Sequence, residues 1–305
     1  MSSAKPGWLD RLRDPDERTL GVLLLAQAFA LLALIVVYPI GKLFWNSFFD
    51  MRLSGGRGTR FVGFENYLLV FADVDFWNAA GNTVLITLVT VPGALVVGLG
   101  LALLANLPFK RQWPVRLALL LPWALPLSFA GLIFAWFFHT DHGVFNDIVR
   151  RLGLGTAGEP RMWLLQPAWA MAAICATIIW KTSSFMALIL LAGLQMIPKT
   201  LYEAAEVDGA SRWQQFWQIT IPMLMPSIVV ALIFRTITAL QTFDIPYTMT
   251  RGGPGNATQT LAMLIHAHTI DYLDMGYGSA LAVCLFVLSM VVSAVYLRQV
   301  GRQAA

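Results

Sequence analysis

Two positively charged side chains, Lys181 and Arg235, stand near the middle of long apolar stretches of the sequence. A charge at the centre of a membrane helix costs about 2.5–3.5 kcal/mol, so such residues normally face a cavity or a partner. Each lies about 12–14 residues from the ends of its stretch, roughly 20 Å of helix and too far to reach water. Since no apolar stretch carries a central Asp or Glu, backbone carbonyls, water, a second subunit or a substrate must compensate these charges. A partner subunit and a substrate are equally good interpretations.

Small and polar residues accompany both cations at helical spacing. Thr238, Ala239 and Thr242 share a helical face with Arg235. Thr182 and Phe185 share one with Lys181. A sugar site needs rings that stack on C–H faces and donors that bond hydroxyl groups. Helix–helix packing explains Thr and Ala at such positions as well, and on the residues alone we favour packing.

A third apolar stretch contains Trp123 between two prolines, Pro122 and Pro126. Proline removes a backbone donor and kinks a helix, so this stretch is predicted to bend around the tryptophan.

Other reactive residue types do not form complete sites. His139, Asp141 and His142 lack a fourth ligand, and we interpret them as residues of a solvated loop. His266 and His268 receive the same interpretation, so no metal site is predicted. No Gly-rich loop followed by Lys-Ser or Lys-Thr is present, so this chain is not expected to bind ATP. Without a catalytic triad or paired carboxylates, we expect neither enzyme activity nor a cofactor.

The elements that position these residues are membrane-spanning helices. The chain has 305 residues, of which 57% are hydrophobic and 12% charged, and a soluble domain carries about twice that charged fraction. About 20 apolar residues span a bilayer, and six runs qualify: 20–40, 79–107, 117–138, 164–197, 221–244 and 275–297. We therefore predict an all-α integral membrane protein with six transmembrane helices.

Lysine and arginine are more frequent in the segments 1–19, 108–116, 198–220 and 298–305 than in the intervening ones, which places the first set in the cytoplasm. We expect a cytoplasmic tail at 1–19, a first helix at 20–48, a five-helix core at 78–297 and a cytoplasmic tail at 298–305. The first apolar run is too long for a signal peptide, so we expect it to be retained. The net charge of +4 reflects this topology, and no basic patch indicates nucleic-acid binding.

The polar segment 198–221 between the fourth and fifth runs has more local structure than a simple connection. Thr200 with Glu203 and Ser211 with Gln214 both have capping-box spacing, which predicts two short helices. Gly209 between them permits a tight turn. The first helix would show small and acidic side chains, and the second an apolar face of Trp213, Phe216, Trp217 and Ile221.

This segment resembles the "EAA loop" of binding-protein-dependent ATP-binding-cassette importers, through Glu-Ala-Ala at 203–205, Asp-Gly-Ala at 208–210 and Ile-x-x-Pro at 219–222. In that family the loop is a coupling helix that docks into a separate ATPase subunit. The resemblance implies this role for Glu203, Ala204, Ala205, Asp208, Gly209 and Ala210. The alternative is an ordinary interfacial hairpin.

Further stretches resemble the sugar-importer branch, specifically its maltose-type first permease. They are 62–67, Trp180-Lys181, 192–195 leading into Ile197-Pro198, 250–255 and 276–278. The resemblance implies the type I importer fold and a sugar site halfway across the membrane. That site would be lined by Trp123, Leu127, Lys181, Thr182, Phe185, Arg235, Thr238, Ala239 and Thr242. The chain lacks the maltose permease's extra N-terminal helices and large insertion, as do trehalose- and α-glucoside-type permeases.

The implied protein is a permease subunit in a bacterial or archaeal inner membrane, forming half of the path for a di- or oligosaccharide. It would contact membrane lipid and assemble with a homologous second permease, an ATPase dimer that binds ATP and Mg²⁺, and an extracytoplasmic sugar-binding protein. An anionic polyol phosphate such as glycerol 3-phosphate is the alternative substrate, which two intramembrane cations would suit. A secondary transporter is less favoured, because repeats with paired broken helices are not evident.

Overall fold

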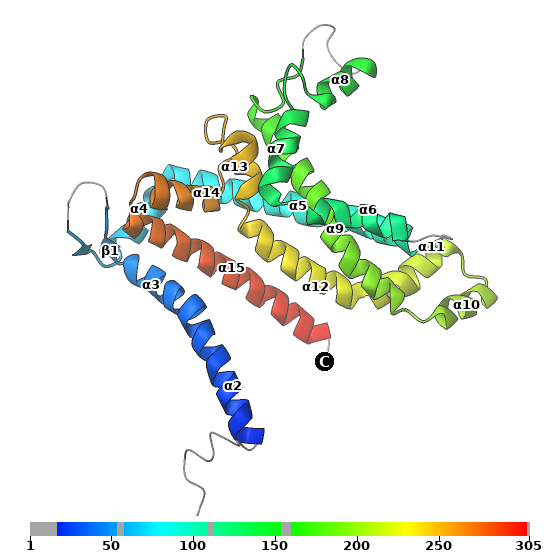
Figure 1. Cartoon of the computed structure of the whole chain (residues 1–305). Coiled ribbons are helices and arrows are strands. Elements are labelled where there is room, and N and C mark those ends of the chain that lie inside the picture. Colours follow the sequence, from blue (N-terminus) through cyan, green and yellow to red (C-terminus); the bar gives the residue numbers. More distant parts are fainter. Residues whose placement is uncertain (1–16, 54–57, 109–112, 154–159, 304–305) are drawn as a thin grey trace, which may run out of the picture.

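The computed structural model describes residues 17–53, 58–108, 113–153 and 160–303. It begins with one long helical segment made of α2 (Glu17–Leu32), the π-helical turn η1 (Ala33–Val37) and α3 (Tyr38–Asn46). No residue in its most apolar window is buried. In Figure 1, α2 leans away from the other helices, whereas α3 contacts α15 through Phe44 and Phe286. Residues 17–19 therefore belong to a helix, whereas residues 1–16 of the predicted tail lie outside the described ranges.

A short antiparallel hairpin follows the first helical segment. Strand β1 (Phe49–Asp50) pairs with β2 (Arg60–Phe61), with Phe49 opposite Phe61. Helix α4 (Glu65–Ala72) then leads into the core.

Four long helices form the core: α5 (Val74–Asn106), α9 (Pro167–Gln195), α12 (Ile221–Leu240) and α15 (Met275–Gln303). Helices α5 and α9 approach closely through small residues, since a Cβ on Gly98 would lie 2.6 Å from that of Met186. Ala94, Met186 and Ala231 join α5, α9 and α12 in one buried cluster. Residues 298–303, predicted as a tail, continue α15.

The predicted span 117–138 is two helices, α6 (Trp113–Ala124) and α7 (Leu127–Phe137), bent by 95°. The bend confirms the expectation from the two prolines, but Pro122 lies inside α6 and the break occurs at Pro126. Pro126 has extended backbone geometry at the start of α7 and no N–H with which to continue α6. Five described helices are long and apolar enough to cross a membrane, and the bent pair makes a sixth span.

Short helices connect these spans. Helix α8 (Val144–Arg151) lies between α7 and α9, while α10 (Lys199–Val207), α11 (Arg212–Gln215) and η2 (Phe216–Thr220) lie between α9 and α12. Helices α13 (Asp244–Thr250), α14 (Leu261–His266) and η3 (Ala267–Asp271) precede α15. In Figure 1, α10 and α11 occupy one end of the core and β1 and α4 the other.

Candidate functional site

The polar segment 198–221, here called the polar hairpin, folds as two short helices joined by a turn. Helix α10 begins at Lys199 with Pro198 as its N-cap and without a side-chain cap. The predicted capping box of Thr200 and Glu203 is therefore wrong, because Pro198 starts the helix earlier and places Thr200 in its first turn. The second predicted box is confirmed, since Ser211 and Gln214 bond each other's backbone N–H groups at the start of α11.

The turn between these helices depends on Gly209. Its φ is +76°, and no atom lies within 4 Å of where its Cβ would be. The backbone conformation, not crowding, therefore selects glycine there.

Hydrogen bonds fix the shape of the polar hairpin, while most of its predicted coupling residues are exposed. The hydroxyl groups of Tyr202 and Thr220 lie 2.9 Å apart, and Gln215 donates to the Ala210 carbonyl at 3.2 Å. Most predicted coupling residues are exposed (Glu203, Ala204, Asp208 and Gly209), whereas Ala205 and Ala210 are half-buried. Val207 at the tip is 89% exposed. The braces fix the shape of a surface that the described residues leave uncovered.

The aromatic face predicted after the turn is only partly exposed. Trp213 and Trp217 are exposed, whereas Phe216 and Ile221 are half-buried. The rings of Trp213, Phe216 and Trp217 contact one another, with centroids between 5.1 and 6.0 Å apart.

Lys181 lies at the break between α6 and α7. Its Nζ donates a 2.8 Å hydrogen bond to the carbonyl oxygen of Trp123, in the last turn of α6. The last carbonyls of a helix lack partners and carry partial negative charge. The positive charge of Lys181 and the partial negative charge at the end of α6 thus compensate each other within the same chain.

Arg235 belongs to α12, points toward α5 and is 3% exposed. Its guanidinium donates to the hydroxyl of Thr90 at 2.9 Å and to that of Thr238 at 3.3 Å. Its Nε has no hydrogen-bond partner, and among the described residues it forms no ion pair with a carboxylate.

The remaining predicted lining residues differ in their exposure. Thr182 bonds the carbonyl of Ile178 in its own helix, Ala239 is buried, and Phe185 is half-buried. The predicted face shared by Arg235 and Thr242 is wrong, because α12 ends at Leu240. Trp123 and Leu127 are exposed on either side of the helix break.

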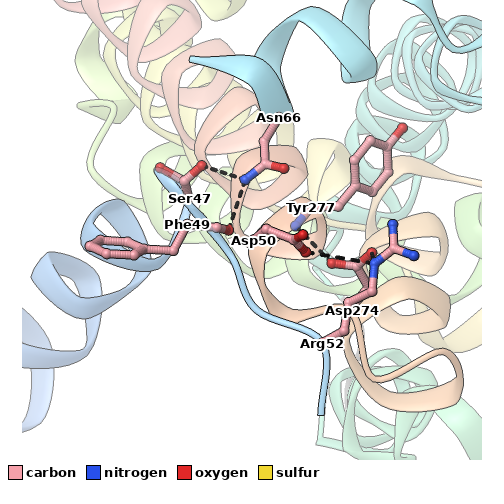
Figure 2. A network of polar contacts seen from close by, with 7 residues as sticks. All are labelled: Ser47, Phe49, Asp50, Arg52, Asn66, Asp274 and Tyr277. Carbon is pink, nitrogen blue, oxygen red and sulfur yellow. Dashed lines mark hydrogen bonds and ion pairs between the residues drawn. The ribbon is translucent and has the colours of Figure 1, made fainter. Parts of the chain in front are cut away.

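Sequence reasoning gave no role to a polar network at the other end of the core, here called the α15 joint. It consists of Ser47, Phe49, Arg52, Asn66, Asp274, Gly276 and Tyr277, and Figure 2 shows all of these except Gly276. Asn66 donates to the carbonyls of Ser47 and Phe49 at 2.8 and 3.0 Å. Arg52 pairs with Asp274 at 3.0 Å. The stretches 62–67 and 276–278, which resemble the sugar-importer branch, could have indicated this network, because the fold brings both of them to the joint.

Gly276 and Tyr277 complete the α15 joint. A Cβ on Gly276 would lie 2.0 Å from the Phe49 carbonyl oxygen, so only glycine fits there. The Tyr277 hydroxyl donates to Asp73 at 2.6 Å. The joint thus fastens the first helical segment to α15 and to the start of α5.

No three His, Cys, Asp or Glu side chains converge as metal ligands within the described ranges. His139 instead accepts from the backbone N–H of Asp141 at 3.2 Å.

Residues 94–303 match the family described as "binding-protein-dependent transport system inner membrane component". The chain is 65% identical over 293 residues to the sulfoquinovosyl glycerol transport system permease protein SmoG of Agrobacterium fabrum, covering 96% of this chain and 94% of that protein. It is 39% identical over 287 residues to the trehalose/maltose transport system permease protein MalF of Thermococcus litoralis, covering 94% and 95%.

The fold is similar to a chain in the crystal structure of a bacterial importer of the acidic polysaccharide alginate. The TM-score is 0.80 at 22% identity, covering 97% of this chain and 98% of that one. The chain belongs to the family of binding-protein-dependent inner-membrane transport components: it is a multi-pass permease of an ATP-binding-cassette importer, without a cofactor, which works with a solute-binding protein and a separate ATPase.

Proposed function

We propose that this chain is the permease of an importer for a carbohydrate that carries an anionic group, of the sulfoquinovosyl glycerol type. The observation that carries the proposal is 65% identity over 96% of the chain to a permease named for that compound. A sulfoquinovosyl group bears a sulfonate, which is negative at neutral pH. The buried cation Lys181, which has a single acceptor in the structure, supports an anionic cargo.

A neutral disaccharide of the trehalose or maltose type is the second candidate. It is favoured by the 39% identical trehalose/maltose permease. Uptake of labelled sulfoquinovosyl glycerol by vesicles containing the whole transporter, in competition with trehalose, maltose and glycerol 3-phosphate, separates the candidates. We expect only the unlabelled sulfonated glycoside to compete well. Strong competition by trehalose or maltose with weak competition by the sulfonated compound would reject the anionic assignment.

The polar hairpin is proposed as the contact through which the ATPase moves this subunit. Its exposed tip combines small residues with the carboxylates of Glu203, Glu206 and Asp208. Within the described part of the chain these carboxylates form no ion pair, so their charges are available to a partner. Closure of an ATPase dimer would shift the hairpin, and the braced core helices would follow as a two-state change.

The proposed assembly pairs this chain with a homologous second permease, and the two enclose the path for the sugar. The Lys and Arg distribution supports a cytoplasmic location for the hairpin and both termini.

Gly209→Pro tests the coupling role. Proline cannot adopt the φ of +76° found at Gly209, so the turn must rearrange. We expect the assembled transporter to lose ATPase stimulation by the loaded binding protein and to keep ATP binding.

Gly153→Pro is the matched control. Gly153 follows α8 with φ of +62°, open space around its Cβ position, and an N–H that donates to the carbonyl three residues earlier, as does that of Gly209. We expect this variant to retain stimulation. Equal losses in both variants, or full stimulation in Gly209→Pro, would refute the coupling role.

A further inference from the structure

We propose that Lys181 recognises the anionic group of the transported carbohydrate at the break between α6 and α7. The inference rests on the proposed function and assigns one residue to the cargo's charge. It follows from how differently the two buried cations are held.

Lys181 has hydrogen-bonding capacity to spare. Its ammonium has three N–H donors, and the structure gives it one acceptor, the Trp123 carbonyl. That carbonyl neutralises the charge only in part, because a helix C-terminus carries about half an elementary charge. No carboxylate pairs with Lys181 in the described ranges. Two donors and a partial charge therefore remain for another acceptor.

The ammonium of Lys181 ends next to two exposed residues. Although Lys181 as a whole is 5% exposed, Trp123, whose carbonyl its Nζ contacts, is 52% exposed. Leu127 on the other side of the break is exposed as well. The tip of the lysine thus ends beside an exposed part of the chain.

Arg235 is held differently, because it bonds a second core helix. The hydroxyl that it contacts most closely belongs to Thr90, which is 0% exposed. Its second acceptor, the exposed Thr238, is one turn along the same helix and at 3.3 Å. We interpret Arg235 as a strut between α5 and α12, and we assign the charge of the cargo to Lys181, whose acceptor lies at the helix break.

The groups at the break suit a sulfonated glycoside. A sulfonate offers three acceptor oxygens to the free N–H groups of Lys181, and charge-assisted hydrogen bonds are the strong kind, particularly away from water. The exposed indole of Trp123 offers a surface on which the C–H face of a sugar ring stacks. Charge and ring would be recognised by two adjacent side chains.

The test is direct ligand binding to the purified permease–ATPase complex without binding protein. The probes are sulfoquinovosyl glycerol and glucosyl glycerol, which has a hydroxyl group in place of the sulfonate. Lys181→Gln removes the charge and keeps a donor group, on a side chain one bond shorter. We expect the dissociation constant for the sulfonated probe to rise about tenfold or more, and that for the neutral probe to stay within about twofold.

Lys181→Arg and Lys42→Gln serve as controls. The first keeps the charge and should retain most of the affinity for the sulfonated probe. The second removes an exposed cation of α3 and should behave as wild type. Co-elution of each variant with the ATPase subunits in gel filtration shows that the complex is assembled.

Equal weakening of both probes in Lys181→Gln, or unchanged binding of the sulfonated probe, would overturn the assignment. The same holds if the wild-type complex binds neither probe. A wild-type complex that prefers the neutral probe would instead contradict the proposed anionic substrate class itself, so the two failures are distinguishable.

Discussion

The polar hairpin and the α15 joint are both polar structures at the ends of an apolar core, but they use their polar groups in opposite ways. In the joint, Asn66, Arg52 and Tyr277 bond groups of the same chain. In the hairpin, the carboxylates of Glu203 and Asp208 remain exposed. Polar groups satisfied internally stabilise the fold, whereas exposed groups on a braced scaffold are free to bind a partner.

The two regions also use glycine differently. Gly276 is required because a backbone oxygen occupies the place of a Cβ, whereas Gly209 is required by a positive φ in open space. Changes in the joint should therefore lower stability, and changes in the hairpin should lower coupling.

The largest expected effect is that of Gly276→Ala. The new methyl would overlap the Phe49 carbonyl, and the backbone must move, at a cost of about 3 kcal/mol or more. We expect a strong loss of folded protein in the membrane, measured by fluorescence-detected gel filtration. Gly209→Ala, with a backbone cost of about 1–2 kcal/mol, should accumulate and show reduced coupling. Normal accumulation of Gly276→Ala would break the comparison.

Asn66→Ala should have the next largest effect. It leaves the carbonyls of Ser47 and Phe49 without their donor, which costs about 1–3 kcal/mol. We expect a lower thermal unfolding midpoint in detergent, with unchanged ATPase stimulation per folded complex. A selective loss of stimulation would show that the joint takes part in coupling.

Tyr202→Phe tests the brace of the hairpin. Only the contact to the Thr220 hydroxyl is removed, worth about 1 kcal/mol. We expect stimulated ATPase activity to fall about two- to fivefold while the unfolding midpoint stays close to wild type. If instead the midpoint falls and stimulation does not change, the brace belongs to the fold rather than to coupling.

The smallest effect concerns pH and His268, beside the joint. Burial lowers the pKa of His268, and the carboxylates of Asp274, Asp73 and Asp75 oppose this shift. The folded state therefore favours the neutral ring, and stability should fall as the pH drops below about 6.5, because the unfolded chain takes up the proton first. Unfolding midpoints between pH 8 and 5.5 measure this.

His268→Phe supplies the control for the pH experiment. It keeps a ring against Tyr277, whose centroid lies 4.5 Å from that of His268, and it removes the titrating group. The pH dependence should become weaker in this variant. An unchanged dependence would exclude His268 as its source.

Local patterns were sufficient wherever neighbouring residues determine the structure. Ser211 and Gln214 form their capping box, Gly209 has a positive φ, and the span with two prolines breaks at Pro126. The start of α10 was missed because Pro198 outweighs the hydroxyl of Thr200 as a helix-start signal. The end of α12 before Thr242 was missed because no Gly or Pro marks it, and the next such residue is Pro246.

Contacts between distant residues were not predictable from one sequence. The sequence showed that Lys181 and Arg235 need compensation, but not that one acceptor is a carbonyl freed by a broken helix and the other a threonine on α5. Nor did it indicate that Asn66 donates to the Phe49 carbonyl of strand β1, or that Asp274 forms an ion pair with Arg52.

The sequence by itself determined the membrane location, the number of spans, the broken span and the polar hairpin, because apolar run length, proline and capping residues act locally. Only the tertiary structure decided that Lys181 ends at the helix break and that Arg235 connects α12 to α5. The physical reason is that burial and hydrogen-bond partners depend on which helices are neighbours, and that arrangement is a property of the packed core.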